Sequence, residues 1–249
     1  MQLDGKNAIV YGASGSMGGA VARGFAAAGA RVFLASRTPG PLETLAAQIR
    51  DAGGRAEVRL VDAMDRDAVD AHAAEVARSA GSLDISVNAV SVPVVQDVPL
   101  TEIGLDDFLA PITQLSRTHF ITATAAARQM STQGSGVVIM LSASSSYETR
   151  HQMGGFSLAN AGIEALTRAL AGEFGRPGVR VVGIRSNFTP ETYPEVTAQD
   201  VAPLVRDTLL GRLPRLAEIA GTAVYLASPA AGAMTGAVVN LSCGAIVGS

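Results

Sequence analysis

Residues 7–22 read Asn-Ala-Ile-Val-Tyr-Gly-Ala-Ser-Gly-Ser-Met-Gly-Gly-Ala-Val-Ala. A short apolar run leads into a glycine cluster, and the cluster opens into an alanine-rich segment with helical spacing, so we predict a strand, a tight turn and a helix. Glycine lets the backbone approach a ligand closely, and the unpaired N–H groups at a helix start attract phosphate. The stretch favours a dinucleotide site, although tight packing between helix and strand would also require small residues.

The composition of the whole chain indicates one globular domain over residues 1–249. Hydrophobic residues make up 48% of the 249 residues and charged residues 16%, which is enough apolar material for a large core. The formal net charge is −3, and no cluster of Lys and Arg is interleaved with aromatic residues. We therefore predict no nucleic-acid partner.

Cysteine and histidine are too sparse to indicate a disulfide or a structural metal. Cys243 is the single cysteine, and His72, His119 and His151 lack metal-ligand spacing. We place His72 on a solvated helix face and His119 on a packed helix. The apolar run before the first glycine is too short for a signal-peptide core, and no stretch reaches the ~18 apolar residues of a membrane span. We predict a cytoplasmic protein with no membrane partner.

Apolar runs alternate with helical patterns along the chain, which predicts an α/β fold: a single-domain, Rossmann-type, doubly wound parallel sheet of seven strands. Gly29 and Gly53 follow helical segments, where a left-handed residue ends a helix. The predicted strands are residues 8–11, 32–35, 56–61, 85–89, 137–141, 180–184 and 237–241. Ligands of such sheets bind at the carboxyl ends of the strands.

The order of these landmarks resembles the short-chain dehydrogenase/reductase family over essentially the whole chain. Gly12 and Gly18 fall where that family has the first and last glycines of its turn, with Ser16 at the middle one. Asp62 ends the third strand as the family's adenine-contacting Asp does, and Asn88 remains of its Asn-Asn-Ala-Gly turn. The resemblance assigns to the cofactor Gly12, Ser14, Ser16, Met17, Gly18, Asp62, Asn88 and Asn160. Asp62 could equally form a plain turn, and Asn88 could tie adjacent strands together.

The end of the second predicted strand favours NADP(H) over NAD(H). An acid at this place would accept from the ribose 2′-OH and repel a 2′-phosphate. The chain has instead Ser36, Arg37 and Thr38, a guanidinium and two hydroxyls that suit a phosphate dianion. The alternative is that Arg37 is an ordinary solvated loop residue.

The family's Tyr-x-x-x-Lys pair is absent from this chain. In register with it, Phe156 takes the Tyr position and Asn160 the Lys position. Positions four apart share one helix face, so in the family the ammonium lowers the pKa of the phenol, which exchanges a proton with the substrate. Phe156 has no such proton, and Asn160 has no charge, although its amide could still bind a ribose hydroxyl.

Other side chains near the same strand ends are candidates for the missing chemistry. Ser142 and Ser144 flank Ala143, which takes the family's serine position. Tyr147 and His151 follow the fifth strand and Tyr193 follows the sixth, and a histidine suits general acid catalysis near neutral pH. For each of the last three, the alternative is a loop residue with a packing role or none.

Three function classes remain open. The first is an atypical NADP(H) oxidoreductase, because hydride transfer resides in the nicotinamide. The second is a non-redox enzyme, such as a cyclase, isomerase or dehydratase, and the third is a catalytically silent NADP(H)-binding protein. The segment of residues 186–211 is expected to cover a small substrate with largely apolar walls.

The family resemblance implies a homo-tetramer or homo-dimer formed through two long helices, the fourth and fifth, and the C-terminal strand. Small residues on these helices would permit close packing between copies, and the alternative is packing against the sheet of the same chain. The residues in question are Ala123, Ala126, Ala127, Ala161, Ala165 and Ala169.

Overall fold

The computed structural model describes residues 1–148 and 152–247. In this part of the chain, seven parallel strands form one sheet in the order β3-β2-β1-β4-β5-β6-β7. The strands are β1 Asn7–Tyr11, β2 Arg31–Ser36, β3 Arg55–Leu60, β4 Ile85–Asn88, β5 Gly136–Ala143, β6 Val179–Ser186 and β7 Val238–Leu241. The single-domain doubly wound fold predicted from the sequence is therefore confirmed, with boundaries that differ by one or two residues.

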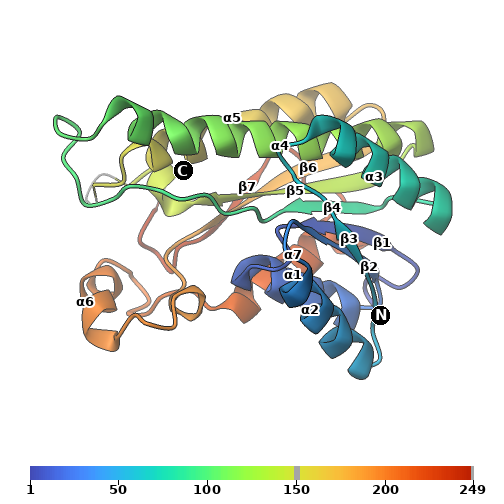
Figure 1. Cartoon of the computed structure of the whole chain (residues 1–249), viewed down its shortest axis with the longest axis horizontal. Helices are drawn as coiled ribbons and strands as arrows, with labels where there is room; N and C mark the ends of the chain where they lie inside the picture. Colours follow the sequence, from blue (N-terminus) through green and yellow to red (C-terminus); the bar gives the residue numbers. More distant parts are fainter. Residues whose placement is uncertain (149–151, 248–249) are drawn as a thin grey trace.

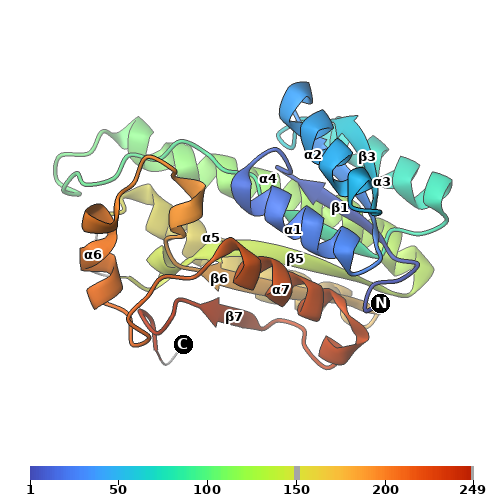
Figure 2. The same cartoon turned by 90° about the horizontal axis from the view of Figure 1, so that it is seen from below.

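Helices cover both faces of the sheet, with α3, α4 and α5 on one face and α1, α2 and α7 on the other (Figure 1). The helices are α1 Ser16–Ala27, α2 Pro39–Asp51, α3 Arg66–Ala80, α4 Leu105–Gln133, α5 Gly155–Phe174, α6 Ala198–Arg206 and α7 Leu216–Ala227. Short 3-10 turns lie at η1 Ser144–Ser146, η2 Pro190–Thr192 and η3 Pro229–Ala231. Figure 2 shows α6 at one end of the sheet.

Alternation along each strand divides the core into two layers. In β1, Ala8 and Val10 pack toward α1, whereas Ile9 and Tyr11 pack toward α3 and α4. Both faces of the central strands are buried beneath helices, which explains the near-continuous apolar run in β5. The order of the strands reverses between β1 and β4, and in such sheets this switch point opens the crevice that receives a ligand.

The prediction for His72 is wrong. Its side chain is only 6% exposed and meets the Tyr11 ring edge-on, with 5.8 Å between the ring centroids. His72 shares the face of α3 with Val69, Ala73 and Val76, and this face packs on the sheet. His119 is buried on α4, as predicted. Within the described residues, no helix combines the length and apolar character needed to cross a membrane.

Candidate functional site

The glycine turn after β1 is built so that only glycine fits at its two key positions. Gly12 has a φ of 73°, and a Cβ placed there would lie 2.5 Å from the Ala89 carbonyl oxygen. A Cβ on Gly18 would collide with the carbonyl oxygen of Gly12. The turn can therefore press against both β4 and the first turn of α1. This close packing leaves no room for a side chain at either glycine, at the carboxyl end of β1.

Helix α1 begins directly after this turn, and in the described part of the chain its N-terminus has no side-chain cap. Gly15 caps the helix, and among the described residues no side chain accepts a hydrogen bond from the first-turn N–H groups. Ser14 and Ser16 are exposed, and Met17 is half-buried. Unpaired N–H groups at a helix start, with no acid in the first turn, suit a phosphate group.

Asp62 lies just after β3 and Asn88 ends β4, two strands of the sheet that β2 and β1 separate, and each side chain has a structural hydrogen bond. A carboxylate oxygen of Asp62 accepts from the Met64 N–H at 2.9 Å. The Asn88 amide donates to Thr122 Oγ1 at 3.0 Å, and its oxygen accepts from the Val90 N–H at 2.9 Å. Asn88 therefore ties β4 to α4 and shapes the following turn.

The end of β2 presents the basic and hydroxyl groups that the sequence analysis singled out. Ser36 Oγ bonds to the backbone of Thr38, which caps α2. Arg37 and Thr38 are exposed, and Ser36 is half-buried. A guanidinium and two hydroxyls are thus available beside the crevice for a phosphate group.

Phe156, Asn160 and Glu164 form a row on one face of α5, one helical turn apart. Phe156 packs against the apolar layer between α5 and the sheet. The side chain of Asn160 is buried and donates to the Phe156 carbonyl oxygen at 2.8 Å and to Ser145 Oγ at 3.3 Å. The two positions that the sequence predicts for the family's acid–base pair thus hold an apolar ring and an amide that is already hydrogen-bonded.

A buried ion pair continues this row, and the sequence analysis missed it. Arg185, near the end of β6, donates from Nη2 to Glu164 Oε2 at 2.6 Å and from Nε to Oε1 at 2.7 Å. Both side chains are only 3% exposed. Ser142 and Ser146 also donate to Glu164 Oε1, at 3.0 Å and 2.7 Å. Burial alone would raise the pKa of Glu164, but the hydrogen bonds from Arg185, Ser146 and Ser142 hold it below its ordinary value.

The remaining catalytic candidates lie around this pair. The ring of Tyr147 covers the Arg185 guanidinium, whose Cζ is 4.2 Å from the ring centroid. Ser144 donates to Asn187 Oδ1 at 3.0 Å, which joins the ends of β5 and β6. Tyr193 stacks on Phe188 with 5.1 Å between centroids. His151 lies outside the described residues.

A charged residue within an apolar pattern was the signal for the missed pair. Glu164 falls on the buried face of α5, and Arg185 ends an apolar strand. Each would be costly to bury alone, so the two together indicate a salt bridge. Among the described residues, no group of His, Cys, Asp and Glu could hold a metal ion.

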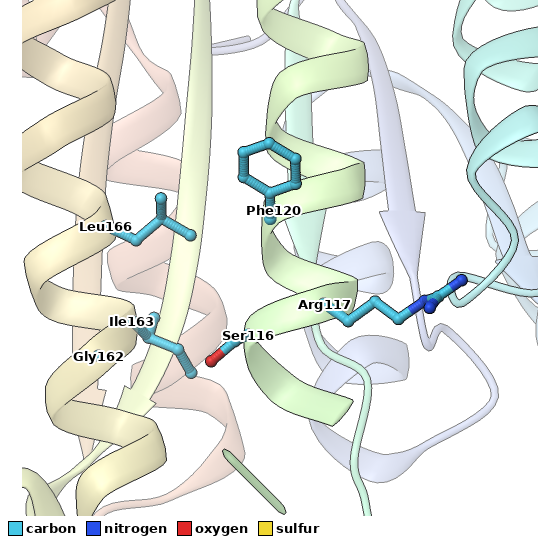
Figure 3. Close-up of a pocket in the computed structure, with 6 residues that line it drawn as sticks. All are labelled: Ser116, Arg117, Phe120, Gly162, Ile163 and Leu166. Atoms are coloured by element: carbon cyan, nitrogen blue, oxygen red, sulfur yellow. The ribbon is translucent and has the colours of Figure 1, made fainter. Parts of the chain in front are cut away.

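A separate groove of about 420 Å³ runs between α4 and α5 on the outside of the molecule (Figure 3). It is lined by Ser116, Arg117, Phe120, Gly162, Ile163 and Leu166. None of the candidate site residues lines it. The prediction that alanines of α4 form an intermolecular face is wrong, because Ala123, Ala126 and Ala127 are each 1% exposed inside this chain. Ala165 and Ala169 on α5 are exposed.

A doubly wound parallel sheet, with a glycine turn that leads into an open helix N-terminus, defines a dinucleotide-binding protein of the Rossmann type. Residues 12–245 match the family described as enoyl-(acyl carrier protein) reductase. The chain belongs to the short-chain dehydrogenase/reductase family. This membership makes it part of an oxidoreductase family that binds a nicotinamide cofactor.

Its relatives include proteins with each of the two cofactors. An uncharacterised oxidoreductase of Mycobacterium tuberculosis is 32% identical over 98% of this chain and 93% of its own length. The crystal structure of a gluconate 5-dehydrogenase from Burkholderia cenocepacia in complex with NADP and tartrate is 26% identical, with a TM-score of 0.89 over 100% of this chain and 98% of that one. A 7α-hydroxysteroid dehydrogenase complexed with NADH and 7-oxo glycochenodeoxycholic acid is also 26% identical, with a TM-score of 0.86 over 98% and 95%. Family membership therefore does not choose between NADP(H) and NAD(H).

Proposed function

We propose that the chain is an atypical NADP(H)-dependent oxidoreductase that acts on a small, largely apolar substrate without the usual Tyr/Lys pair. The observation that carries the proposal is the glycine turn. The turn and the open N-terminus of α1 retain the features that a dinucleotide requires, even though Phe156 and Asn160 have replaced the acid–base pair. A purely structural turn would not require an uncapped helix start.

Each candidate cofactor residue has a place in this proposal. Bound NADP(H) would supply the hydride. The N–H groups after Gly12 and at the start of α1 would hold the pyrophosphate, with Ser14, Ser16 and Met17 around them. Ser36, Arg37 and Thr38 would bind the 2′-phosphate, because a guanidinium fork matches a phosphate. The residues left for the adenine and ribose are Asp62, Asn88 and Asn160.

The segment of residues 186–211 would cover the substrate. It contains the stacked Phe188 and Tyr193, and its helix α6 turns half-buried Val201 and Leu204 away from solvent. Apolar and aromatic side chains with few polar groups suit a small apolar molecule.

Titration calorimetry tests the cofactor assignment. We expect NADPH to bind at least about tenfold more tightly than NADH, because Arg37 meets the phosphate and no acid opposes it. Arg37→Ala should remove most of this difference. Arg176→Ala, which removes an exposed arginine after α5, is the matched control and should change neither affinity. Equal affinity for both cofactors in the unaltered chain would exclude the NADP(H) assignment.

The replaced acid–base pair favours a second candidate, a catalytically silent NADP(H)-binding protein. Phe156 cannot donate a proton, and the Asn160 amide is committed to Ser145 and the helix backbone. Tight NADPH binding without turnover of any carbonyl compound would support this function. Conversion of a substrate without a change in nicotinamide absorbance would instead indicate a non-redox enzyme such as a cyclase, isomerase or dehydratase.

For assembly, we propose a homo-tetramer or homo-dimer in which a second copy lies along the groove between α4 and α5. Phe120 and Leu158 on these helices are 45% and 54% exposed, and Gly162 has open space above it. Light scattering should return a multiple of the 25.4 kDa chain mass, and Phe120→Glu should lower it. A mass near that of one chain at micromolar concentration would exclude this assembly.

A further inference from the structure

Tyr147, Arg185 and Glu164 form one connected unit beneath the candidate site. Glu164 holds the guanidinium of Arg185 through two short hydrogen bonds, and the guanidinium lies 4.2 Å from the centre of the Tyr147 ring. Hydrogen bonds to Glu164 raise the pKa of Arg185, burial lowers it, and charge and hydrogen bonding with Tyr147 raise it further. The arginine is thus a buried, permanent cation, and a cation over a ring face orients that ring.

The guanidinium that lies over the Tyr147 ring limits where the phenol proton can go. A guanidinium has only donors, so Arg185 cannot accept the O–H proton of Tyr147. The O–H proton of Tyr147 is therefore left for another acceptor. Because Tyr147 is 51% exposed, this proton is within reach of a bound molecule or of water.

Tyr147 also lies close to the place of the missing acid–base pair. It follows the turn η1 at the carboxyl end of β5. In that turn, Ser145 accepts from Asn160, the residue at the family's Lys position, and Ser146 donates to Glu164 one helical turn further along α5. The turn is thus tied to α5 at two points, and Tyr147 comes directly after them.

We propose that Tyr147 is the proton donor of this site and that Arg185 and Glu164 are its positioning residues. The proposal rests on the proposed NADP(H)-dependent reduction. In that reaction, a hydride from NADPH forms a C–H bond at the carbonyl carbon, and the electron pair of the C=O π bond moves to the oxygen. The oxygen takes the proton of the Tyr147 hydroxyl, and the products are an alcohol, NADP⁺ and a phenolate.

The surroundings of Tyr147 suit both the loss of its hydroxyl proton and the later return of a proton. The positive charge of Arg185 lies 4.2 Å from the centre of the Tyr147 ring, close to the negative charge that the proton transfer leaves there. The exposed side of the ring lets water return the proton. Glu164 balances the charge of Arg185, so that the cation can stay buried behind the ring.

The first experiment follows NADPH absorbance with two probes, cyclohexanone and the more electrophilic 9,10-phenanthrenequinone. Tyr147→Phe should lower kcat about 10²–10⁴-fold, the usual cost of losing a positioned acid, while the calorimetric Kd for NADPH stays within about twofold. Tyr225→Phe removes the same hydroxyl from the exposed face of α7 and should leave kcat unchanged.

The second experiment tests the positioning residues without breaking the fold. The double variant Glu164→Leu/Arg185→Met replaces the buried pair by apolar side chains of similar size, a change that proteins generally tolerate. We expect kcat to fall at least about tenfold at unchanged NADPH affinity. The chain has four tyrosines, so 3-fluorotyrosine labelling gives four ¹⁹F resonances, of which Tyr147→Phe identifies one. That resonance should shift in the double variant, and the other three should not.

The outcomes separate this proposal from the proposed function. Wild-type kcat in Tyr147→Phe would overturn the donor role. A chain that binds NADPH and reduces neither probe would also overturn it and would leave the cofactor assignment standing. A chain that does not bind NADPH would overturn the proposed function itself. An unchanged Tyr147 resonance in the double variant would overturn the positioning role.

Discussion

The buried pair of Glu164 and Arg185 makes a strong prediction about stability. Glu164→Leu leaves the Arg185 cation in a site that is 3% exposed, without its carboxylate partner. Removing one member of a buried ion pair typically costs about 3–5 kcal/mol, because the remaining charge loses its solvation without compensation. Glu164 accepts two hydrogen bonds from Arg185, at 2.6 Å and 2.7 Å, and two more from serines, so we expect its loss to cost an amount within this range.

Thermal and urea unfolding would measure the effect. For a chain of this size, 1 kcal/mol shifts Tm by about 2–4 °C, so Glu164→Leu should lower Tm by roughly 6–20 °C. The double variant Glu164→Leu/Arg185→Met should recover most of that loss, since it removes both charges. Glu173→Leu, at an exposed position of the same helix, is the matched control and should change stability by less than about 0.5 kcal/mol.

Two results would refute this reasoning. One is a Glu164→Leu variant that is destabilised by less than about 1 kcal/mol, which would mean that the pair is solvated or has little effect on stability. The other is a double variant as unstable as the single one. In that case, the lost packing and the serine hydroxyls, rather than the uncompensated charge, would be responsible.

Three further predictions concern the site and the core. In the Tyr147→Phe variant, adding Phe156→Tyr alone should restore little ketone reduction, whereas adding Phe156→Tyr with Asn160→Lys should restore a measurable rate by NADPH absorbance, because the phenol needs the ammonium to lower its pKa from ~10; brisk reduction after Phe156→Tyr alone is added would contradict this. Gly12→Ala should weaken NADPH binding by at least about tenfold in calorimetry, since its Cβ would meet the Ala89 carbonyl at 2.5 Å and the φ of 73° is unfavourable for alanine; Gly40→Ala, which has open space above it, is the control. Burial lowers the pKa of His72 and of His119 from 6.5 to about 4. As the pH falls, these histidines therefore bind protons in the unfolded chain at a higher pH than in the folded chain. Each histidine should therefore cost about 3 kcal/mol of stability as the pH falls from 6.5 to 4. Urea unfolding at pH 7 and pH 4.5 would measure this loss, and a His72→Leu variant with the full pH dependence of the wild type would contradict it.

The sequence by itself determined the fold and the place of the glycine turn. Alternating apolar runs and helical patterns depend on local periodicity, and the sheet confirmed every predicted strand to within one or two residues. The sequence alone identified Gly12 and Gly18 as the key positions of the turn, because a tight turn before a helix needs glycine where the backbone is unusual or closely approached. The sequence also placed Ser36 and Arg37 at the carboxyl end of β2, where ligands of such sheets bind, and their role in holding a phosphate stays a prediction.

Only the tertiary structure decided which side chains meet across elements. Glu164 and Arg185 are 21 residues apart, and their contact depends on the register that sets Ser142 of β5 beside Arg185 of β6, with α5 above both. His72 was misplaced for the same reason, since the helical period leaves open how wide a face of α3 the sheet buries. The alanines of α4 likewise turned inward, because small residues suit packing on the same chain's sheet as well as on a second copy. Periodicity can be recognised within one segment, whereas a contact depends on how two segments are placed. The ion pair of Glu164 and Arg185 next to Tyr147 was therefore visible only in the tertiary structure.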